Sequence, residues 1–417
     1  MNNHQRSSGL LIIVICLVTT PLVTSAEPVS GTETGLFTLS GEPFHMILDE
    51  DRLFWIQDSK YLNASEQGLF YYNISDGMTK QLGQIGAPAI SGDRIVFSEK
   101  GIMTINLSTG STVQLTNQND AVLPVSDLRF NQNPCIDGDR VVWTEHEGLV
   151  HSNVEGGRIV ILNLTTGERQ YLPTGSPGNQ STPIISGNFI LWKDYRHSGP
   201  DDQELYLFDL EKGTEERLPT ENPVKANPYL SGDEVVWTEE IHGIDMIIHY
   251  SISSRTRTVV GQGSVHQGHL PPVSDDRVVW LQSKNPLDIR EERNAIMLMD
   301  LRTGEKRQIT PFRRGLSHPV ISGEYIIYTR GAGDDWFNEP REVVLYTLSS
   351  SQGETVNGTD TRPGNGNSPT PATNSLDKGE AMPPTSSPGF TCITLIAGCI
   401  AALAIKKVRD RISICLL

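Results

Sequence analysis

The sequence predicts an all-β fold, a seven-bladed β-propeller of four-stranded antiparallel blades, because one short pattern recurs seven times at intervals of roughly 45 residues. In each copy, a tight turn such as Ser-Gly-Asp is followed by three or four apolar residues that end in an aromatic residue. The seven copies end at Trp55, Phe97, Trp143, Trp192, Trp237, Trp280 and Tyr328. The propeller is expected to occupy residues 34–350 with almost no helix.

Each unit divides into four strands, called a to d in chain order. Strand a is short and apolar, strand b ends in the aromatic residue, and strand c ends in a Gly-bearing turn, as at 205–213 and 296–304. Strand d is polar and ends in Leu or Ile. The glycines supply the positive φ that tight hairpin turns need. Recurrence of the aromatic residue at one place in strand b predicts packing between blades, and a carbohydrate-stacking row is the alternative.

Blade seven lacks a clear strand d, because only the poor match at 353–356 follows its strand c. Residues 34–39, just ahead of blade one, resemble such a strand. An open ring would leave two unpaired strand edges, which invite aggregation. We therefore predict that residues 35–40 pair with residues 343–348 and form the outer strand of blade seven.

Blade four shows the pattern in its fullest form, with Trp192-Lys-Asp-Tyr-Arg196 followed by Glu204-Leu-Tyr-Leu-Phe-Asp-Leu210. This pattern resembles the TolB-type propeller repeat, and the resemblance covers roughly residues 34–350. It implies the architecture but no activity, since such propellers serve enzymes and binding proteins alike.

Both ends of the chain predict export and attachment to a membrane. Residues 1–26 read as a signal peptide, with an apolar run at 10–18 and small residues before Glu27. A second apolar segment at 390–405 is followed by the basic residues Lys406, Lys407, Arg409 and Arg411. A basic cluster stays on the cytoplasmic side, so the propeller is expected at the extracellular face of the cell membrane, anchored by its C-terminus.

The segment between the propeller and this anchor, residues 351–388, is rich in Pro, Gly, Ser and Thr and is expected to be a disordered stalk. Pro388-Gly389-Phe390 then opens the C-terminal region, residues 389–417. This order resembles the PGF-CTERM sorting signal of archaeal surface proteins, which implies that an archaeosortase removes the tail and attaches a lipid. The extra residues 412–417 depart from the pattern, and an ordinary single transmembrane span is the alternative.

Six Asn-x-Ser/Thr sequons occur in the chain. Asn73, Asn106 and Asn163 fall in c–d turns where other blades carry Asp, so we expect their side chains to bond their own turn backbone. The candidates for glycosylation are Asn63, Asn179 and Asn357.

The composition and motifs narrow the function. With 34 Lys and Arg against 50 Asp and Glu, the net charge is -16, and no basic stripe offsets it, so nucleic acid is not expected as a partner. The nucleophile elbow, the zinc-protease motif and the phosphate-binding loop are absent from the sequence. We therefore predict a non-enzymatic cell-surface propeller that binds a surface protein, a glycan or an envelope component.

The binding face is expected on one side of the ring. The a–b and c–d turns are short and uniform and form what we call the turn face. The b–c and d–a loops vary in length and form the opposite side, called the variable-loop face. His266, His269 and His318 are assigned to the last two d–a loops, which lead into the strands that line the central channel.

Three converging imidazoles can hold a divalent metal ion with an open position. The pattern resembles that of the oligogalacturonate-lyase-like propellers, whose metal sits over the channel on histidines. The alternative function is therefore a metal-dependent polysaccharide lyase or hydrolase, and no other cofactor is expected.

Overall fold

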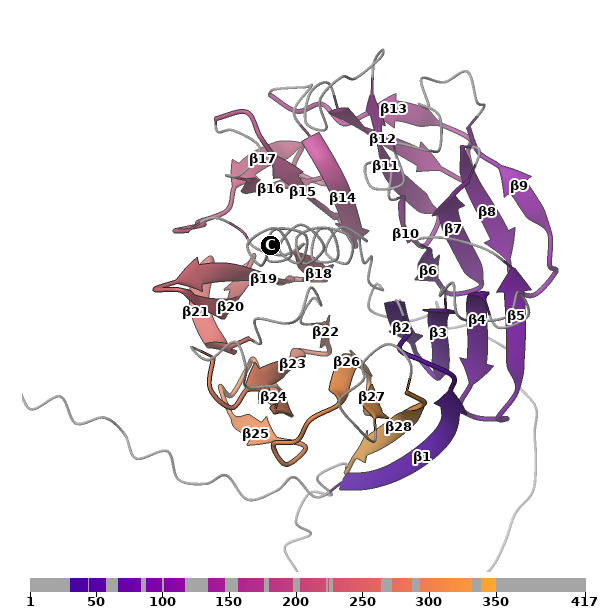
Figure 1. Cartoon of the computed structure of the whole chain (residues 1–417). Coiled ribbons are helices and arrows are strands. Elements are labelled where there is room, and N and C mark those ends of the chain that lie inside the picture. Colours follow the sequence, from indigo (N-terminus) through magenta and orange to yellow (C-terminus); the bar gives the residue numbers. More distant parts are fainter. Residues whose placement is uncertain are drawn as a thin grey trace, which may run out of the picture.

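The computed structural model describes residues 31–43, 45–57, 67–83, 88–99, 101–116, 134–146, 157–175, 180–197, 203–222, 224, 228–263, 272–286, 293–331 and 339–349. Over these residues the predicted fold is confirmed: seven four-stranded antiparallel sheets surround one axis, and all the regular structure is strand. Strand a of each blade lies nearest the centre of the ring (Figure 1). The predicted signal peptide, stalk and anchor lie outside the described residues, and the described part contains no helix that could cross a membrane.

The first four blades follow the chain in the order a, b, c, d. Blade one contains β2 (His45–Asp49), β3 (Arg52–Gln57), β4 (Gly68–Asn73) and β5 (Thr79–Gly83). Blade two contains β6 (Ala89–Ser91), β7 (Arg94–Ser98), β8 (Ile102–Asn106) and β9 (Thr112–Gln114). Blade three contains β10 (Cys135–Asp137), β11 (Arg140–His146), β12 (Gly157–Asn163) and β13 (Arg169–Tyr171). Blade four contains β14 (Gln180–Ser186), β15 (Phe189–Asp194), β16 (Glu204–Asp209) and β17 (Thr214–Arg217).

The last three blades complete the ring, and the seventh takes one strand from the N-terminus. Blade five contains β18 (Tyr229–Ser231), β19 (Glu234–Ile241), β20 (Ile244–Ser251) and β21 (Thr256–Gln262). Blade six contains β22 (Val273–Ser274), β23 (Arg277–Ser283), β24 (Asn294–Asp300) and β25 (Lys306–Gln308). Blade seven contains β26 (Leu316–Ser322), β27 (Tyr325–Gly331), β28 (Arg341–Leu348) and β1 (Gly31–Leu39).

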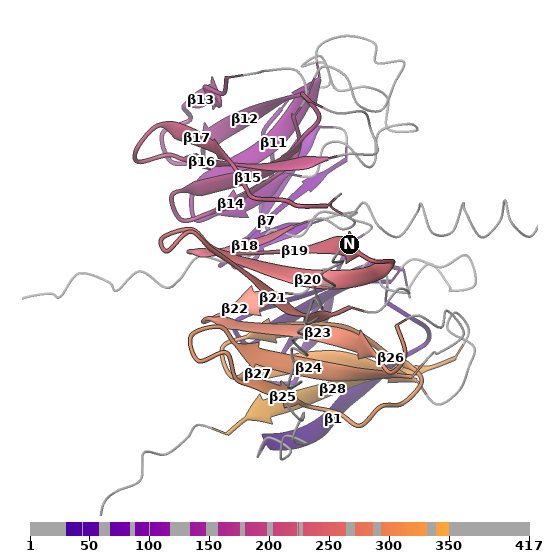
Figure 2. The ribbon, with the colours of Figure 1, turned by 90° about the vertical axis from the view of Figure 1, so that its left-hand side faces the viewer.

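The core lies between the blades, and the strand-b aromatic residues form its centre. Every one of the seven is buried, none more than 4% exposed, which confirms their predicted place and rules out a solvent-facing row of aromatics. Both faces of strand b are covered by neighbouring sheets, so runs such as Val141-Val142-Trp143 are apolar without alternation. Figure 2 shows the blades edge-on, stacked face against face around the ring.

The recurrent Ser-Gly-Asp turn joins adjacent blades. The side chain that ends strand a accepts a hydrogen bond from the first turn N–H of the next blade. This contact joins Ser91 to Gly138, Asp137 to Gly187, Ser186 to Gly232, Ser274 to Gly323 and Ser322 to Glu50, with donor–acceptor distances of 2.6 to 3.2 Å. The repeated sequence therefore encodes the spacing between blades as well as the turn within each blade.

The c–d turns explain three of the sequons. The Oδ1 atom of Asn73 accepts hydrogen bonds from the N–H groups of Ser75 (2.8 Å) and Asp76 (3.1 Å). Asn106 and Asn163 occupy the same position and also accept N–H groups of their own turns. As predicted, these asparagines hold the turn, and the sequon hydroxyl of Thr165 donates to Asp139 (2.7 Å).

The ring closes as the sequence predicted, with β1 pairing antiparallel to β28 (Figure 1). The strand is longer than expected, because pairing begins at Gly31, opposite Leu348, and ends at Leu39, opposite Arg341. Residues 343–348 therefore pair with 31–37, earlier in the chain than the predicted 35–40. Phe37 crosses the seam to contact Trp55 of blade one, with ring centroids 5.1 Å apart.

The lengths of the connections separate the two faces. Each a–b turn is two residues long, and each c–d turn has four or five residues. The b–c connections range from two to ten residues and the d–a connections from five to twenty. The turn face is thus uniform, and the variation in connection length concentrates on the variable-loop face.

Candidate functional site

A polar cluster lies on the variable-loop face where blade seven meets blade one. Glu42, in the connection between β1 and β2, places Oε1 2.8 Å from Nδ1 of His318 and Oε2 2.6 Å from Nε of Arg341. The hydroxyl of Ser317 also donates to Glu42. One carboxylate therefore binds the entrance of blade one to β26 and β28 of blade seven.

The backbone explains how His318 reaches this carboxylate. His318 lies inside β26, where the pairing with β27 shifts register between Ser317 and Val320, and its φ is 50°. The sequence placed it in the d–a loop, but the strand extends further and carries the residue on a bulge. Bulges re-aim side chains, and this one directs a buried imidazole toward the seam.

The cluster perturbs the titration of its carboxylate. Burial alone would raise the pKa of Glu42, but the hydrogen bond and charge of His318 and the charge of Arg341 outweigh it. The pKa of Glu42 is therefore lowered, and the carboxylate is ionised at neutral pH. Arg341, which is fully buried, also donates from Nη1 to the carbonyl of Gly315 (3.1 Å).

Sequence reasoning identified only His318 of this cluster and missed Glu42, Arg341 and His45, of which His45 is the further imidazole. It begins β2 and is buried, and its Nε2 atom has no hydrogen-bond partner. Burial lowers the pKa of His45 to about 4, and the charge on His318 acts in the same direction. The ring is therefore neutral near pH 7, the form that binds metal ions. No motif surrounds His45, so only its place at the start of the first strand a gave a signal.

Only one of the three predicted metal ligands lies among the described residues. His318 is placed as above, whereas His266 and His269 lie outside the described residues, as do Asn63, Asn179 and Asn357. Within the described ranges, no group of three His, Cys, Asp or Glu side chains is arranged to hold a metal ion.

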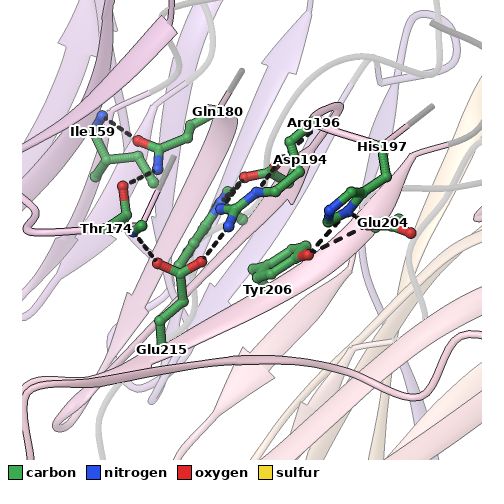
Figure 3. Close-up of polar contacts among 11 residues, drawn as sticks. Ile159, Thr174, Gln180, Asp194, Arg196, His197, Glu204, Tyr206 and Glu215 are labelled. Atoms are coloured by element: carbon green, nitrogen blue, oxygen red, sulfur yellow. Dashed lines mark hydrogen bonds and ion pairs between the residues drawn. The ribbon is translucent and has the colours of Figure 1, made fainter. Parts of the chain in front are cut away.

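A second polar cluster lies on the same face in blade four, and Figure 3 shows it in detail. Asp194, which is fully buried, accepts hydrogen bonds from Nε1 of Trp192 (2.9 Å) and from Nε and Nη2 of Arg196 (2.8 and 2.7 Å). Arg196 continues to Glu215 in β17 through Nη1 (2.6 Å). These contacts explain the Trp-x-Asp-x-Arg spacing as a buried link between strands b and d.

The outer part of this cluster is accessible. Nδ1 of His197 lies 3.0 Å from Glu204, whose other oxygen is 2.8 Å from Arg217. Tyr206 contacts the same imidazole nitrogen at 3.3 Å. The His197 side chain is 60% exposed, so the network fixes one edge of the ring and leaves the other toward solvent.

The serine of the seam cluster is not arranged as a nucleophile. Nucleophilic catalysis by serine requires a hydroxyl that donates to a base oriented by a third group. Ser317 instead donates to Glu42 and pairs with Thr329 (2.6 Å). What these groups offer is a rigid set of hydrogen-bonding and charged atoms on one face.

Comparisons with known proteins agree on the fold. The structure is similar to TolB from Acinetobacter baumannii, with 16% identity and a TM-score of 0.43, over 62% of this chain and 65% of TolB. For oligogalacturonate lyase from Vibrio parahaemolyticus the values are 11% and 0.51, over 78% of this chain and 96% of the lyase. For acylaminoacyl peptidase from Pyrococcus horikoshii they are 15% and 0.50, over 74% and 51%.

At these identities the likeness shows the propeller fold alone. The chain spans less than two thirds of TolB and about half of the peptidase. No protein-family model matches the sequence, and no curated protein matches it. The fold and the two clusters define a seven-bladed propeller with a uniform turn face and a chemically varied opposite face.

Proposed function

We propose that this protein is a non-enzymatic cell-surface propeller that recognises a protein, a glycan or an envelope component through its variable-loop face. One observation carries the proposal: the first and last residues of the propeller, Gly31 and Leu348, are paired with each other at the turn face. Attachment through the C-terminal segment, as the sequence predicts, then tethers the turn face. The variable-loop face is then the side of the ring opposite the point of attachment.

The exposed outer part of the blade-four cluster, called the blade-four rim, carries side chains that can bind a ligand. His197 and Arg217 are 60% and 52% exposed, yet each is held by Glu204. Side chains fixed before binding lose less conformational entropy when a ligand arrives. An imidazole edge beside a guanidinium offers a donor pair to acidic or hydroxyl-rich surfaces.

The test compares two faces of the same molecule. The full chain is immobilised and exposed to envelope extracts and to a glycan array, as wild type and as the variants His197→Ala and Arg217→Ala. Lys212→Ala is the matched control, because Lys212 is also exposed and ion-paired but lies in a c–d turn. We expect both rim variants to weaken the capture of the same ligand at least about fivefold, or ~1 kcal/mol, and the control to leave it unchanged. Equal capture by all variants would contradict the proposal.

A second candidate is the metal-dependent polysaccharide lyase or hydrolase. The observation that favours it is the buried, unpartnered Nε2 of His45 within reach of the charge of His318. Metal analysis of the purified protein, with His45→Ala and His318→Ala as variants, separates the two functions. A stoichiometric divalent ion that both variants lose supports the enzyme, and a metal-free wild type rejects it.

A further inference from the structure

A groove of about 650 Å³ lies on the turn face, opposite the two clusters described above. It spans the a–b turns of blades five and six, the c–d turn of blade six and the end of β28 in blade seven. It therefore lies beside Ser349, where the propeller ends.

The groove coincides with a break in the contacts between turns. Among the described residues, the boundary between blades five and six is the one at which no hydrogen bond or ion pair joins the two a–b turns. Ser231 ends strand a of blade five, but it makes no hydrogen bond to Asp275, the first turn residue of blade six. In blades one and two, Arg52 and Arg94 at the start of strand b reach Asp93 and Asp139 of the following blade. Blade five carries Glu234 at this position, and Glu234 pairs with His249 of its own blade.

The groove carries an excess of negative charge. Six carboxylates line it, from Asp233, Glu234, Asp275, Asp276, Asp300 and Glu305. Three guanidinium groups oppose them, so six minus three leaves a formal charge of -3. Each guanidinium is already paired inside the groove: Arg277 with Asp275, Arg302 with Asp276 (3.4 Å), and Arg307 with Glu305 (2.8 Å).

Of the remaining carboxylates, Asp300 also lies 3.8 Å from Arg302, and the other two have partners that are not guanidinium groups. Asp233 accepts hydrogen bonds from the hydroxyls of Ser251 (2.8 Å) and Ser253 (2.7 Å), and Glu234 pairs with the imidazole of His249. Beneath them, Val273, Leu298 and Leu348 are buried and form an apolar floor. A lysine or arginine side chain fits such a site, because its aliphatic stem covers apolar surface while its charged head meets carboxylates.

From this charge complementarity we propose that the groove binds a basic peptide segment of a partner protein, one that presents two or three lysine or arginine side chains. A metal ion is the weaker occupant, because the described carboxylates and imidazoles include no group of three arranged around one point. The site is independent of the recognition proposed for the variable-loop face, which lies on the other side of the ring.

One residue makes the proposal testable without unfolding the protein. Asp275 has a φ of 49°, at a position where Gly92, Gly138, Gly187, Gly232 and Gly323 stand in other blades. A non-glycine residue at positive φ is strained, so Asp275→Gly removes charge and relieves strain together. The variant should be at least as stable as the wild type. A loss of binding would then result from the removed carboxylate and not from unfolding.

The experiment titrates the full chain, purified in detergent at 150 mM salt, into a fluorescent hexapeptide of alternating lysine and alanine. We expect Asp275→Gly combined with Asp276→Asn to weaken binding about tenfold or more, about 1.4 kcal/mol. The matched control is Asp93→Asn, at the equivalent turn of blade two, where Arg52 already pairs with the carboxylate. It should leave the affinity within about twofold.

Three outcomes would overturn the proposal. Equal weakening by the control variant would mean that the net charge of -16 attracts any cation. Equal affinity for spermidine, with the same dependence on Asp275, would make this a site for small amines. No measurable binding by the wild type would reject the groove as a site.

Discussion

The hydrogen bond from a buried indole to a strand-b carboxylate can be measured by comparing two equivalent tryptophans. Trp237 and Trp280 stand at the same place in blades five and six and are 0% and 2% exposed. Nε1 of Trp237 donates to Glu239 at 2.8 Å, whereas Nε1 of Trp280 is buried without a partner. Substitution by Phe removes the same ring atoms at both sites, so the cost of lost packing is shared.

The two substitutions should therefore differ in their effect on the free energy of unfolding by the contribution of the indole hydrogen bond. A bond to a charged group contributes about 1.5–3 kcal/mol, and Glu239, which is fully buried, would keep Arg257 as its only ionic partner at 2.9 Å. At Trp280 the same change removes a buried unsatisfied donor, whose burial costs about 1–3 kcal/mol. We expect Trp237→Phe to lower the free energy of unfolding by at least about 1.5 kcal/mol more than Trp280→Phe.

The assay is urea denaturation followed by far-ultraviolet circular dichroism, since tryptophan fluorescence changes with the substitutions themselves. Trp192→Phe serves as a replicate, because its indole donates to Asp194 at 2.9 Å. If Trp237→Phe and Trp280→Phe agree within about 0.5 kcal/mol, the indole hydrogen bond contributes nothing and the reasoning is refuted.

Three further predictions concern the ring and its buried charge. Deletion of residues 27–40 removes β1, and it should unfold the whole propeller in a single lowered transition; a separate early transition of blade seven would contradict this. Ser322→Ala loses the hydrogen bond that links blade seven to blade one and should cost about 0.5–1.5 kcal/mol in denaturation experiments, while Ser231→Ala, at the boundary without such a bond, should cost nearly nothing. Burial lowers the pKa of Lys193 to about 7, below its unfolded value of 10.5, so the folded protein binds fewer protons and its stability rises with pH between 7 and 10.5. Lys193→Met should be more stable than the wild type at pH 7, and the difference should shrink as the pH approaches 10.5; a difference independent of pH would rule out this cause.

Much of the architecture could be predicted because it repeats. The strand-b aromatics recur in every unit, and a feature that recurs seven times can be aligned without any knowledge of tertiary contacts. The closing strand could be predicted for a related reason, since blade seven lacks a strand d that the other blades have. The register of this strand could not be predicted, because apolar and polar residues alternate only weakly along 31–39 and the pairing is set by β28.

The candidate site could be predicted only in part. His318 was identified from its residue type and its position near the channel, but the bulge in β26 that turns it toward Glu42 depends on pairing with β27. Glu42, His45 and Arg341 belong to no shared pattern and come from distant parts of the chain. They meet because ring closure brings blade seven against blade one.

The sequence by itself determined the blade count, the position of the core aromatics and the contrast between uniform turns and variable loops. These properties are local and repeat along the chain, so each depends on residues that are close in sequence. The tertiary structure decided which side chains meet at the seam, and it left the turns of blades five and six unlinked. Those outcomes depend on the distance between blades, and no single unit of the sequence contains that information.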